Sequence, residues 1–263
     1  MSSDRESTPA QARVLAVTSG KGGVGKTFVS ANLAAALAQR GERVLVLDAD
    51  LGLANLDVVL SLTPKLTLHD VLTGKAPLEQ AVLPAPGGFS VLLAGSGLVE
   101  YSRLTPEVSE KLQEVIRQLA PRFDRILLDT GAGISDVVLY TISLADEVLV
   151  VATPEPTSLT DAYATIKVLA TQQRRRGVRL LVNQTTRQGE GRAIRGQLQQ
   201  VVDRYVTPHL EDAARPFRLE LIGEIPNDPA VREAVQKRRL LLELLPGCPA
   251  AQGVAAAAEK LQA

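Results

Sequence analysis

Short apolar runs alternate along this chain with longer stretches that mix apolar and polar residues. Several of the runs, such as "RVLVLD" and "EVLVVAT", are apolar at nearly every position instead of at every second one. That pattern is typical of strands buried on both faces of a sheet. It predicts strands at 13–18, 43–48, 89–95, 124–129, 147–153, 178–184 and 217–225.

The stretches between these runs have the spacing and the end signals of helices. Pro106 opens one stretch, and Gly41 and Gly177 close two others, as proline and glycine commonly do at helix ends. Strands and helices therefore alternate, which predicts an α/β fold: a single three-layer domain with a mostly parallel, twisted sheet and helices on both faces. The helices are expected at 27–40, 106–119, 157–176, 190–204 and 229–239.

Composition sets limits on this picture. Acidic and basic residues balance at 29 each, so the net charge favours neither a nucleic acid nor a membrane as partner. The single cysteine, Cys248, excludes a disulfide within the chain and a cysteine metal cluster built by one chain. No linker divides the sequence, so we expect a flexible segment at 1–12 and one domain at 13–263 that ends in a peripheral helix. No secretory signal or membrane-spanning run is visible, which predicts a cytoplasmic protein.

The first predicted strand is followed by "GKGGVGKT", which fits the phosphate-binding pattern G-x-x-x-x-G-K-[ST]. Glycines let several backbone N–H groups converge on phosphate oxygens, and the following helix adds its positive N-terminal end. Lys26 is placed to reach the β- and γ-phosphates, and the Thr27 hydroxyl to bind Mg2+. The predicted nucleotide-binding residues of this loop are Gly20, Lys21, Gly22, Gly23, Val24, Gly25, Lys26 and Thr27.

The same glycines also fit G-x-G-x-x-G, the fingerprint of dinucleotide-binding domains, with acidic residues about twenty positions later. That motif has no use for an adjacent lysine and threonine. The pair formed by Lys26 and Thr27 therefore favours the phosphate loop.

Carboxylates follow two other predicted strands. Asp48 and Asp50 stand at the end of the second strand, and Asp129 ends the fourth. Ligands of open α/β sheets bind at the carboxyl ends of the strands, where aspartates can orient an attacking water and hold hydrated Mg2+. We therefore expect Thr27, Asp48 and Asp129 at the metal. Gly131 allows the next segment to change shape when the γ-phosphate leaves.

An ordinary phosphate loop does not require a lysine at position 21. With it, "KGGVGKT" resembles the deviant-Walker-A family, which includes the MinD and ParA ATPases. The resemblance implies that Lys21 contacts ATP bound by a partner chain, and hence a homodimer formed with ATP. It implies that Asp50 faces the attacking water and that Asp48 supports Mg2+ and Lys26. The expected activity is slow, Mg-dependent hydrolysis of ATP to ADP and phosphate, with Lys21, Lys26 and Asp50 as catalytic residues.

Two further segments bear on the nucleotide base. "LLVNQ" contains Asn183, and "IPNDP" contains Pro226 and Asp228. A side-chain amide can pair with both a donor and an acceptor on one base edge. In the resembling family such an asparagine and the backbone after such a proline hold adenine, which implies Asn183, Pro226 and Asp228 as adenine contacts. Turn chemistry is the alternative, because Asn, Pro and Asp are ordinary turn residues.

Several stretches are similar to the flagellar branch of this family, called FlhG or FleN. They include "DADLGLANLDVVL", "TLHDVLTG", "DTGAGISD" and "TPEPTSLTDAYATIKVL". The resemblance implies an ATP-dependent dimerisation switch that regulates flagellar number or placement by engaging a flagellar GTPase, a transcription activator or the C-ring. The alternatives are a positioning ATPase for another cargo, and an anti-activator in which hydrolysis only resets the dimer. An iron–sulfur carrier of this fold needs paired cysteines, which the chain lacks.

The tail and one basic run bear on other partners. The ending "GVAAAAEKLQA" has one lysine and no aromatic residue, so we expect weak membrane binding or none. The run "QQRRRGVR" is interpreted as a solvated helix end and not as a nucleic-acid site, because cations are favourable near a helix C-terminus. Recruitment to the cell pole or the inner membrane face is expected through partner proteins.

Overall fold

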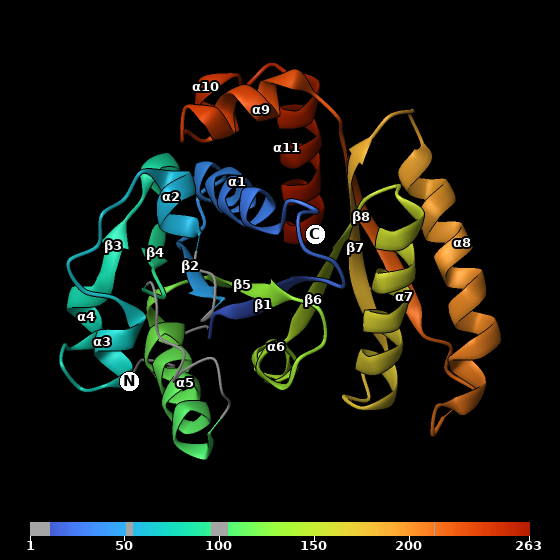
Figure 1. Cartoon of the computed structure of the whole chain (residues 1–263), viewed down its shortest axis with the longest axis horizontal. Coiled ribbons are helices and arrows are strands. Elements are labelled where there is room, and N and C mark those ends of the chain that lie inside the picture. The colour runs from blue at the N-terminus through green and yellow to red at the C-terminus, as the bar shows by residue number, and fades with distance from the viewer. Residues whose placement is uncertain (1–10, 51–54, 96–104, 213) are drawn as a thin grey trace, which may run out of the picture.

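The computed structural model describes residues 11–50, 55–95, 105–212 and 214–263 of the chain (Figure 1). Within these residues the sheet has eight strands in the order β3-β4-β2-β5-β1-β6-β7-β8, and every neighbouring pair is parallel except β3 and β4. The predicted α/β fold is confirmed. The strands are β1 Arg13–Ser19, β2 Val44–Ala49, β3 Val82–Pro84, β4 Ser90–Leu92, β5 Arg125–Ala132, β6 Glu147–Ala152, β7 Gly177–Thr185 and β8 Arg218–Pro226.

The helices lie on both faces of this sheet (Figure 1). They are α1 Lys26–Gln39, α2 Leu56–Leu60, α3 Leu68–Leu72, α4 Leu78–Ala81, α5 Pro106–Leu119, α6 Asp136–Ser143, α7 Pro156–Thr171, α8 Glu190–Tyr205, α9 Pro229–Gln236, α10 Leu241–Leu244 and α11 Pro249–Gln262. Each helix predicted from the sequence is present. The sequence did not predict α6 or the short helices between β2 and β4.

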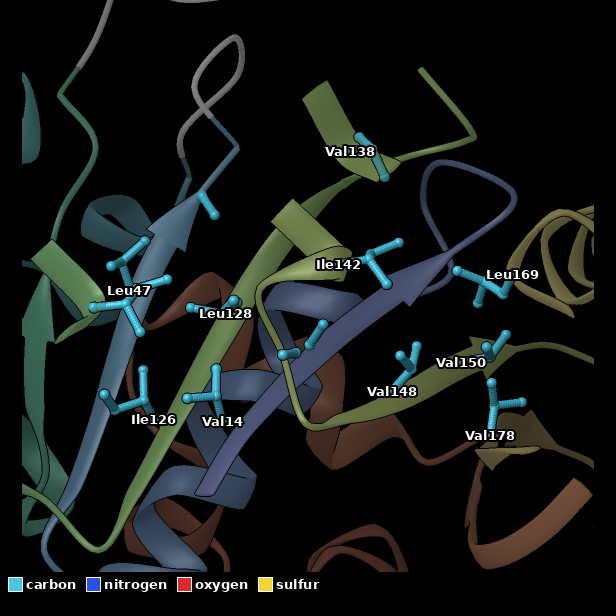
Figure 2. Packing of buried hydrophobic residues seen from close by; sticks show 14 of the residues in the cluster. Val14, Leu47, Ile126, Leu128, Val138, Ile142, Val148, Val150, Leu169 and Val178 are labelled. Atoms are coloured by element: carbon cyan, nitrogen blue, oxygen red, sulfur yellow. The ribbon is translucent and has the colours of Figure 1, made fainter. Parts of the chain in front are cut away.

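Successive strand residues point to opposite faces, so each strand contributes to two cores. Leu15 packs in the core that contains α1 and α11, whereas Val14 packs in the core that contains α5, α6, α7 and α8. Figure 2 shows the second core, where Ile126 and Val148 lie with Ile142 of α6. Burial on both faces explains why the strands have apolar residues at almost every position.

Helix α7 ends five residues before the predicted end at 176. Beyond its end, Arg175 Nη2 donates to the carbonyls of Ile142 and Ala145 at 2.9 and 2.6 Å, at the end of α6. Arg174 has a positive φ of 53° and pairs with Glu211 at 2.8 Å. The arginines of the basic run therefore lie just beyond α7 and bind partners within the protein, although the sequence was interpreted as a solvated helix end.

Both ends of the described chain are packed against the rest of the domain. Residues 1–10 of the predicted flexible segment lie outside the described residues, but Ala12 is buried and its N–H donates to the Ala120 carbonyl. The helix predicted at the C-terminus is α11, which packs on β8 and α1 with its inward face buried. Small residues let α11 approach closely: a Cβ on Gly253 would lie 2.7 Å from the Glu224 carbonyl oxygen. In the parts of the chain that the structure describes, no helix combines the length and apolar character needed to cross a bilayer.

Candidate functional site

The phosphate loop connects the central strand β1 to α1. Gly23 and Gly25 have φ values of 80° and 93°, a conformation that residues with a Cβ rarely adopt. At Gly25 a Cβ would also lie 2.5 Å from the Asn183 side chain. Helix α1 begins at Lys26, so its first N–H groups and its positive end face the loop. The loop thus has the form of an anion-binding site.

Lys26 is half-buried beside two carboxylates. Burial lowers the pKa of its ammonium group, while the charges of Asp129 and Asp50 oppose that shift. Lys26, Asp129 of β5 and Asp50, which follows β2, therefore lie close together. This arrangement offers a positive charge to phosphate oxygens and a carboxylate to an attacking water.

Asp48 and Asp129 lie side by side, because β2 and β5 pair in register at these two residues. Asp129 accepts hydrogen bonds from the Thr27 hydroxyl and, at 2.9 Å, from Ser30 Oγ, and burial raises its pKa to about 6. Burial, together with the charge of Asp129, raises the pKa of Asp48 well above its usual value. Two adjacent buried carboxylates without a cation are costly, so the site favours a bound cation.

The residues fit Mg2+. Asp48 Oδ1 accepts the Asp50 N–H at 3.2 Å, but Asp48 Oδ2 is buried and has no hydrogen-bond partner among the described atoms. Mg2+ takes hard oxygen ligands, keeps several waters and is held by one or two carboxylates plus phosphate oxygens. Within the described residues, no three His, Cys, Asp or Glu side chains are grouped as a metal cage. Thr27, Asp129 and the unpartnered oxygen of Asp48 are thus suited to such a hydrated ion.

A cavity of about 560 Å3 opens beside the loop. Its wall includes Lys26, Thr27 and Asp50 from the predicted site. Gly131 lies against Asp50 there, and a Cβ at Gly131 would meet Asp50 Oδ1 at an ordinary 3.5 Å but Val138 Cγ2 at a tight 3.2 Å. The cavity is also lined by Asn55 and Ser135, which the sequence reasoning did not select although both follow strand ends closely.

A second cavity, of about 540 Å3, lies at the carboxyl ends of β7 and β8 and includes Pro226. Two of the predicted base contacts have other partners. Asn183 Nδ2 donates to the Val24 carbonyl at 2.8 Å and so positions the phosphate loop. Asp228 caps α9 through the Ala230 N–H at 2.9 Å. Residues that the sequence analysis missed here are Thr185, Thr186, Arg187 and Asn227.

Lys21 extends from the loop to the beginning of α7. Its Nζ lies 2.7 Å from Glu155 Oε2 and 3.0 Å from Thr157 Oγ1. The neighbouring Gly20 is in contact with the Asp161 backbone and has no room for a Cβ. The loop is therefore tied to the "TPEPTSLTDAYA" segment at two points, which the sequence alone did not predict.

Hydrolysis of a nucleoside triphosphate is the chemistry that such a loop and its carboxylates serve, and the fold and the site together define a P-loop ATPase. The chain belongs to the ParA family, because the family model described as "NUBPL iron-transfer P-loop NTPase" matches residues 10–262. The chain has a single cysteine, so we do not infer from that description that it transfers iron.

Three known proteins are similar to this chain over most of their length. The antiactivator FleN of Pseudomonas aeruginosa is 44% identical over 249 residues, covering 95% of this chain and 86% of FleN. The flagellum site-determining protein YlxH of Helicobacter pylori is 32% identical and covers 89% and 76% of the two chains. The septum site-determining protein MinD of Pyrococcus horikoshii, solved with Mg-ADP, has a TM-score of 0.75 at 30% identity, covering 95% of this chain and 96% of MinD. The predicted family, ATPase activity and use of ATP, ADP and Mg2+ are confirmed.

Proposed function

We propose that this ATPase is an ATP-dependent dimerisation switch that regulates flagellar number or placement. The observation that carries the proposal is the position of Lys21, at the mouth of the phosphate loop and in contact with the exposed Glu155. The similarity to FleN and YlxH supports the flagellar role.

In the proposed reaction, the loop N–H groups and Lys26 bind the phosphates of ATP. The Asp50 carboxylate orients water toward the γ-phosphorus, in line with the departing ADP oxygen. Thr27, Asp48 and Asp129 hold Mg2+, which when bound neutralises charge on the phosphates. The base occupies the cavity beside Pro226, while Asn183 keeps the loop in position.

Dimerisation follows if Lys21 leaves its own α7 and contacts the ATP of a second chain. The beginning of α7 then loses two of its contacts with the loop, and this change is a signal that a partner can recognise. The proposed partners are a transcription activator, a flagellar GTPase or a C-ring protein. Partners also supply the proposed location at the cell pole or the inner membrane face.

The size of the protein with ADP and with ATP, measured by light scattering, tests the switch. We expect one chain with ADP, two chains with ATP, and a longer-lived dimer for Asp50→Ala, because hydrolysis no longer ends it. Lys21→Ala is the matched variant and should bind ATP but stay a single chain. A molecular mass that is the same with ADP and with ATP would contradict the proposal.

Two other functions have specific support. FleN is described as an antiactivator, which favours a binding module that hydrolysis only resets. If partner binding survives in Asp50→Ala, hydrolysis acts only in the reset. The likeness to MinD favours a positioning ATPase for another cargo, and unchanged flagellation in a strain without the protein would support that function.

A further inference from the structure

Strand β8 is the last strand of the sheet, and its outer side has no neighbouring strand among the described residues. The Arg218 N–H donates to the Arg176 carbonyl, toward β7. Peptide groups alternate in direction along a strand, so the N–H and C=O of Leu219 point outward. Such an edge is a template on which another strand can pair.

Side chains of α8 occupy this edge instead. Gln199 Oε1 accepts the Leu219 N–H at 2.8 Å, and Gln199 Nε2 donates to the Phe217 carbonyl at 2.7 Å. Arg195 Nε donates to the Leu219 carbonyl at 2.9 Å. A side-chain amide has one acceptor oxygen and an N–H donor, so Gln199 takes the place of the N–H and C=O that one residue of a neighbouring strand would direct at this edge. Asp203 holds it there by accepting from the same Nε2 at 2.8 Å.

The α8 side chains at this edge border a hollow of about 710 Å3. The hollow extends from Gln199 and Arg195 over the amino ends of β6, β7 and β8 and reaches Arg218 and Glu220. Arg218 and Glu220 are exposed, whereas the Leu219 side chain between them is buried in the core. The outward groups of Leu219 are thus covered by side chains of α8, and the Leu221 carbonyl further along accepts from Lys260 Nζ of α11 at 3.3 Å.

The sequence of this edge is complementary to itself. If two β8 strands pair antiparallel about Leu219, each Leu219 exchanges both of its hydrogen bonds with the other, as residues of a hydrogen-bonded pair do. Arg218 of each chain then faces Glu220 of the other, and cross-strand pairs of opposite charge are stabilising. One strand register therefore forms both the hydrogen bonds between the two Leu219 residues and the pairs between Arg218 and Glu220.

We propose that the outer edge of β8 is a strand-pairing surface for a second copy of this chain, and that Gln199 and Arg195 keep it closed. Removing both side chains leaves the Leu219 peptide groups unpaired at an open edge. Two copies then join through β8 into one continuous sheet. This contact lies at the edge of the sheet and does not involve the phosphate loop.

The test uses Gln199→Ala with Arg195→Ala, without nucleotide so that no ATP-dependent dimer forms. The matched control is Gln200→Ala with Arg192→Ala, two exposed residues of the same helix. Light scattering over a dilution series should show a shift from one chain to two in the first variant, while the control stays at one. Hydrogen exchange at the Leu219 amide should become faster than in the parent at low concentration and slower again at high concentration.

Adding Glu220→Arg to the first variant places like charges across the pair and should restore a single chain. The proposal is overturned if the first variant stays a single chain at every concentration, or if it associates and Glu220→Arg does not reverse this. Should the double substitution prevent folding, Gln199→Ala alone takes its place, and the same two results decide.

Discussion

Within one chain, Lys21 contacts the beginning of α7. The proposed dimerisation must break this contact. Its side chain is 36% exposed and that of Glu155 is 61% exposed. An ion pair between such groups is weak, because water screens it and two flexible side chains must be held still. The contact therefore keeps Lys21 near the phosphate loop without preventing its release.

Glu155→Gln should make ATP-dependent dimerisation easier. An exposed pair contributes up to about 1 kcal/mol, which corresponds to about a fivefold effect for each chain. Since both chains release a lysine, the dissociation constant of the dimer should fall by up to roughly 25-fold. Light scattering of a dilution series with ATP, in the Asp50→Ala background, measures this constant. Glu79→Gln, an exposed position on α4, is the control, and a weaker dimer for Glu155→Gln would contradict the expectation.

Asp129→Asn should stabilise the protein without nucleotide above about pH 6. Burial raises the pKa of Asp129 from 3.8 to about 6, so the folded state binds this proton more tightly than the unfolded state. The resulting stability is present below pH 3.8 and is lost as pH rises through about 6. Asparagine does not ionise, so the free energy of unfolding of the variant should rise relative to that of the parent over that range, by up to about 3 kcal/mol at neutral pH.

Thermal unfolding of both proteins between pH 4.5 and 8 checks this sign, with the exposed Asp136→Asn as control. With Mg-ATP present the order should reverse, since the variant loses a carboxylate that is proposed to hold Mg2+. A variant that is less stable than the parent at every pH would show that the hydrogen bonds from Thr27 and Ser30 outweigh the burial of charge.

The sequence predicted the residues whose chemistry is set by local spacing. The phosphate loop is one continuous segment, and Asp48 and Asp129 each end an apolar strand, so their meeting at one sheet edge follows from the fold class. Glu155 and Asn183 could not be assigned in this way. Their contacts with Lys21 and Val24 join segments more than 130 residues apart, and only the packing of α7 and β7 brings them together.

At the level of elements, the sequence predicted the helix α11 but not how closely it packs. Its small side chains let the helix axis approach the sheet and α1 closely, which buries Val254 and Leu261 completely. A pattern of large apolar residues predicts buried helices well, but a pattern of small ones depends on what lies opposite.

Gly253→Ala and Gly196→Ala form a matched pair that tests this packing. At Gly253 a Cβ would lie 2.7 Å from the Glu224 carbonyl oxygen, whereas no atom lies within 4 Å of the position at Gly196. The first substitution should cost about 2 kcal/mol or more through overpacking. The second should stabilise α8 by about 0.5–1 kcal/mol, because alanine favours a helix over glycine. Urea unfolding measures both, and equal effects would contradict close packing of α11.

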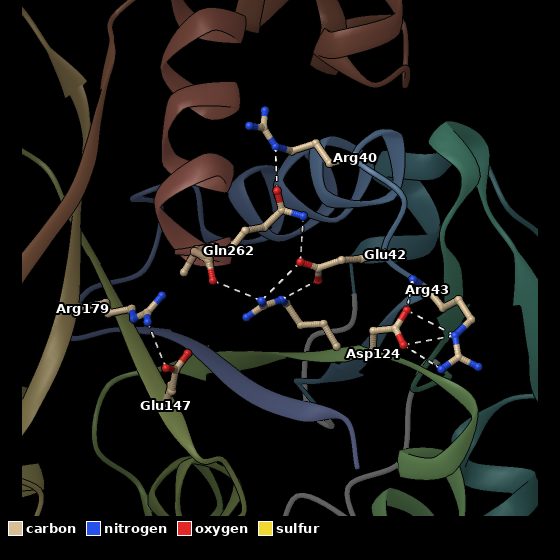
Figure 3. A network of polar contacts seen from close by, with 9 residues as sticks. Arg40, Glu42, Arg43, Asp124, Glu147, Arg179 and Gln262 are labelled. Atoms are coloured by element: carbon tan, nitrogen blue, oxygen red, sulfur yellow. Dashed lines mark hydrogen bonds and ion pairs between the residues drawn. The ribbon is translucent and has the colours of Figure 1, made fainter. Parts of the chain in front are cut away.

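On the scale of the whole molecule, the two ends of the strands have different tasks. The carboxyl ends carry the phosphate loop, Asp48 and Asp50, and the two cavities beside the loop and beside Pro226. The amino ends carry a polar network that joins β2, β5 and α11 (Figure 3). Arg125 Nε donates to Glu42 at 2.8 Å, and its Nη2 to the Leu261 carbonyl at 3.1 Å, while Gln262 donates to Glu42 at 2.9 Å.

Arg125→Ala should therefore lower stability without weakening nucleotide binding. Arg125 is 3% exposed, so its removal leaves Glu42 and the end of α11 without their buried partner. Loss of such a partner costs about 3 kcal/mol, which corresponds to a fall of roughly 6–10 °C in the unfolding midpoint of a domain of this size. Arg43→Ala is the matched control, because Arg43 pairs with Asp124 at 2.6 Å in the same region but is exposed, and its midpoint should change far less. Calorimetry gives the midpoints, and titration with ADP gives the affinities. If ADP affinity falls together with stability in Arg125→Ala, the two ends of the sheet are coupled and the separation of tasks is wrong.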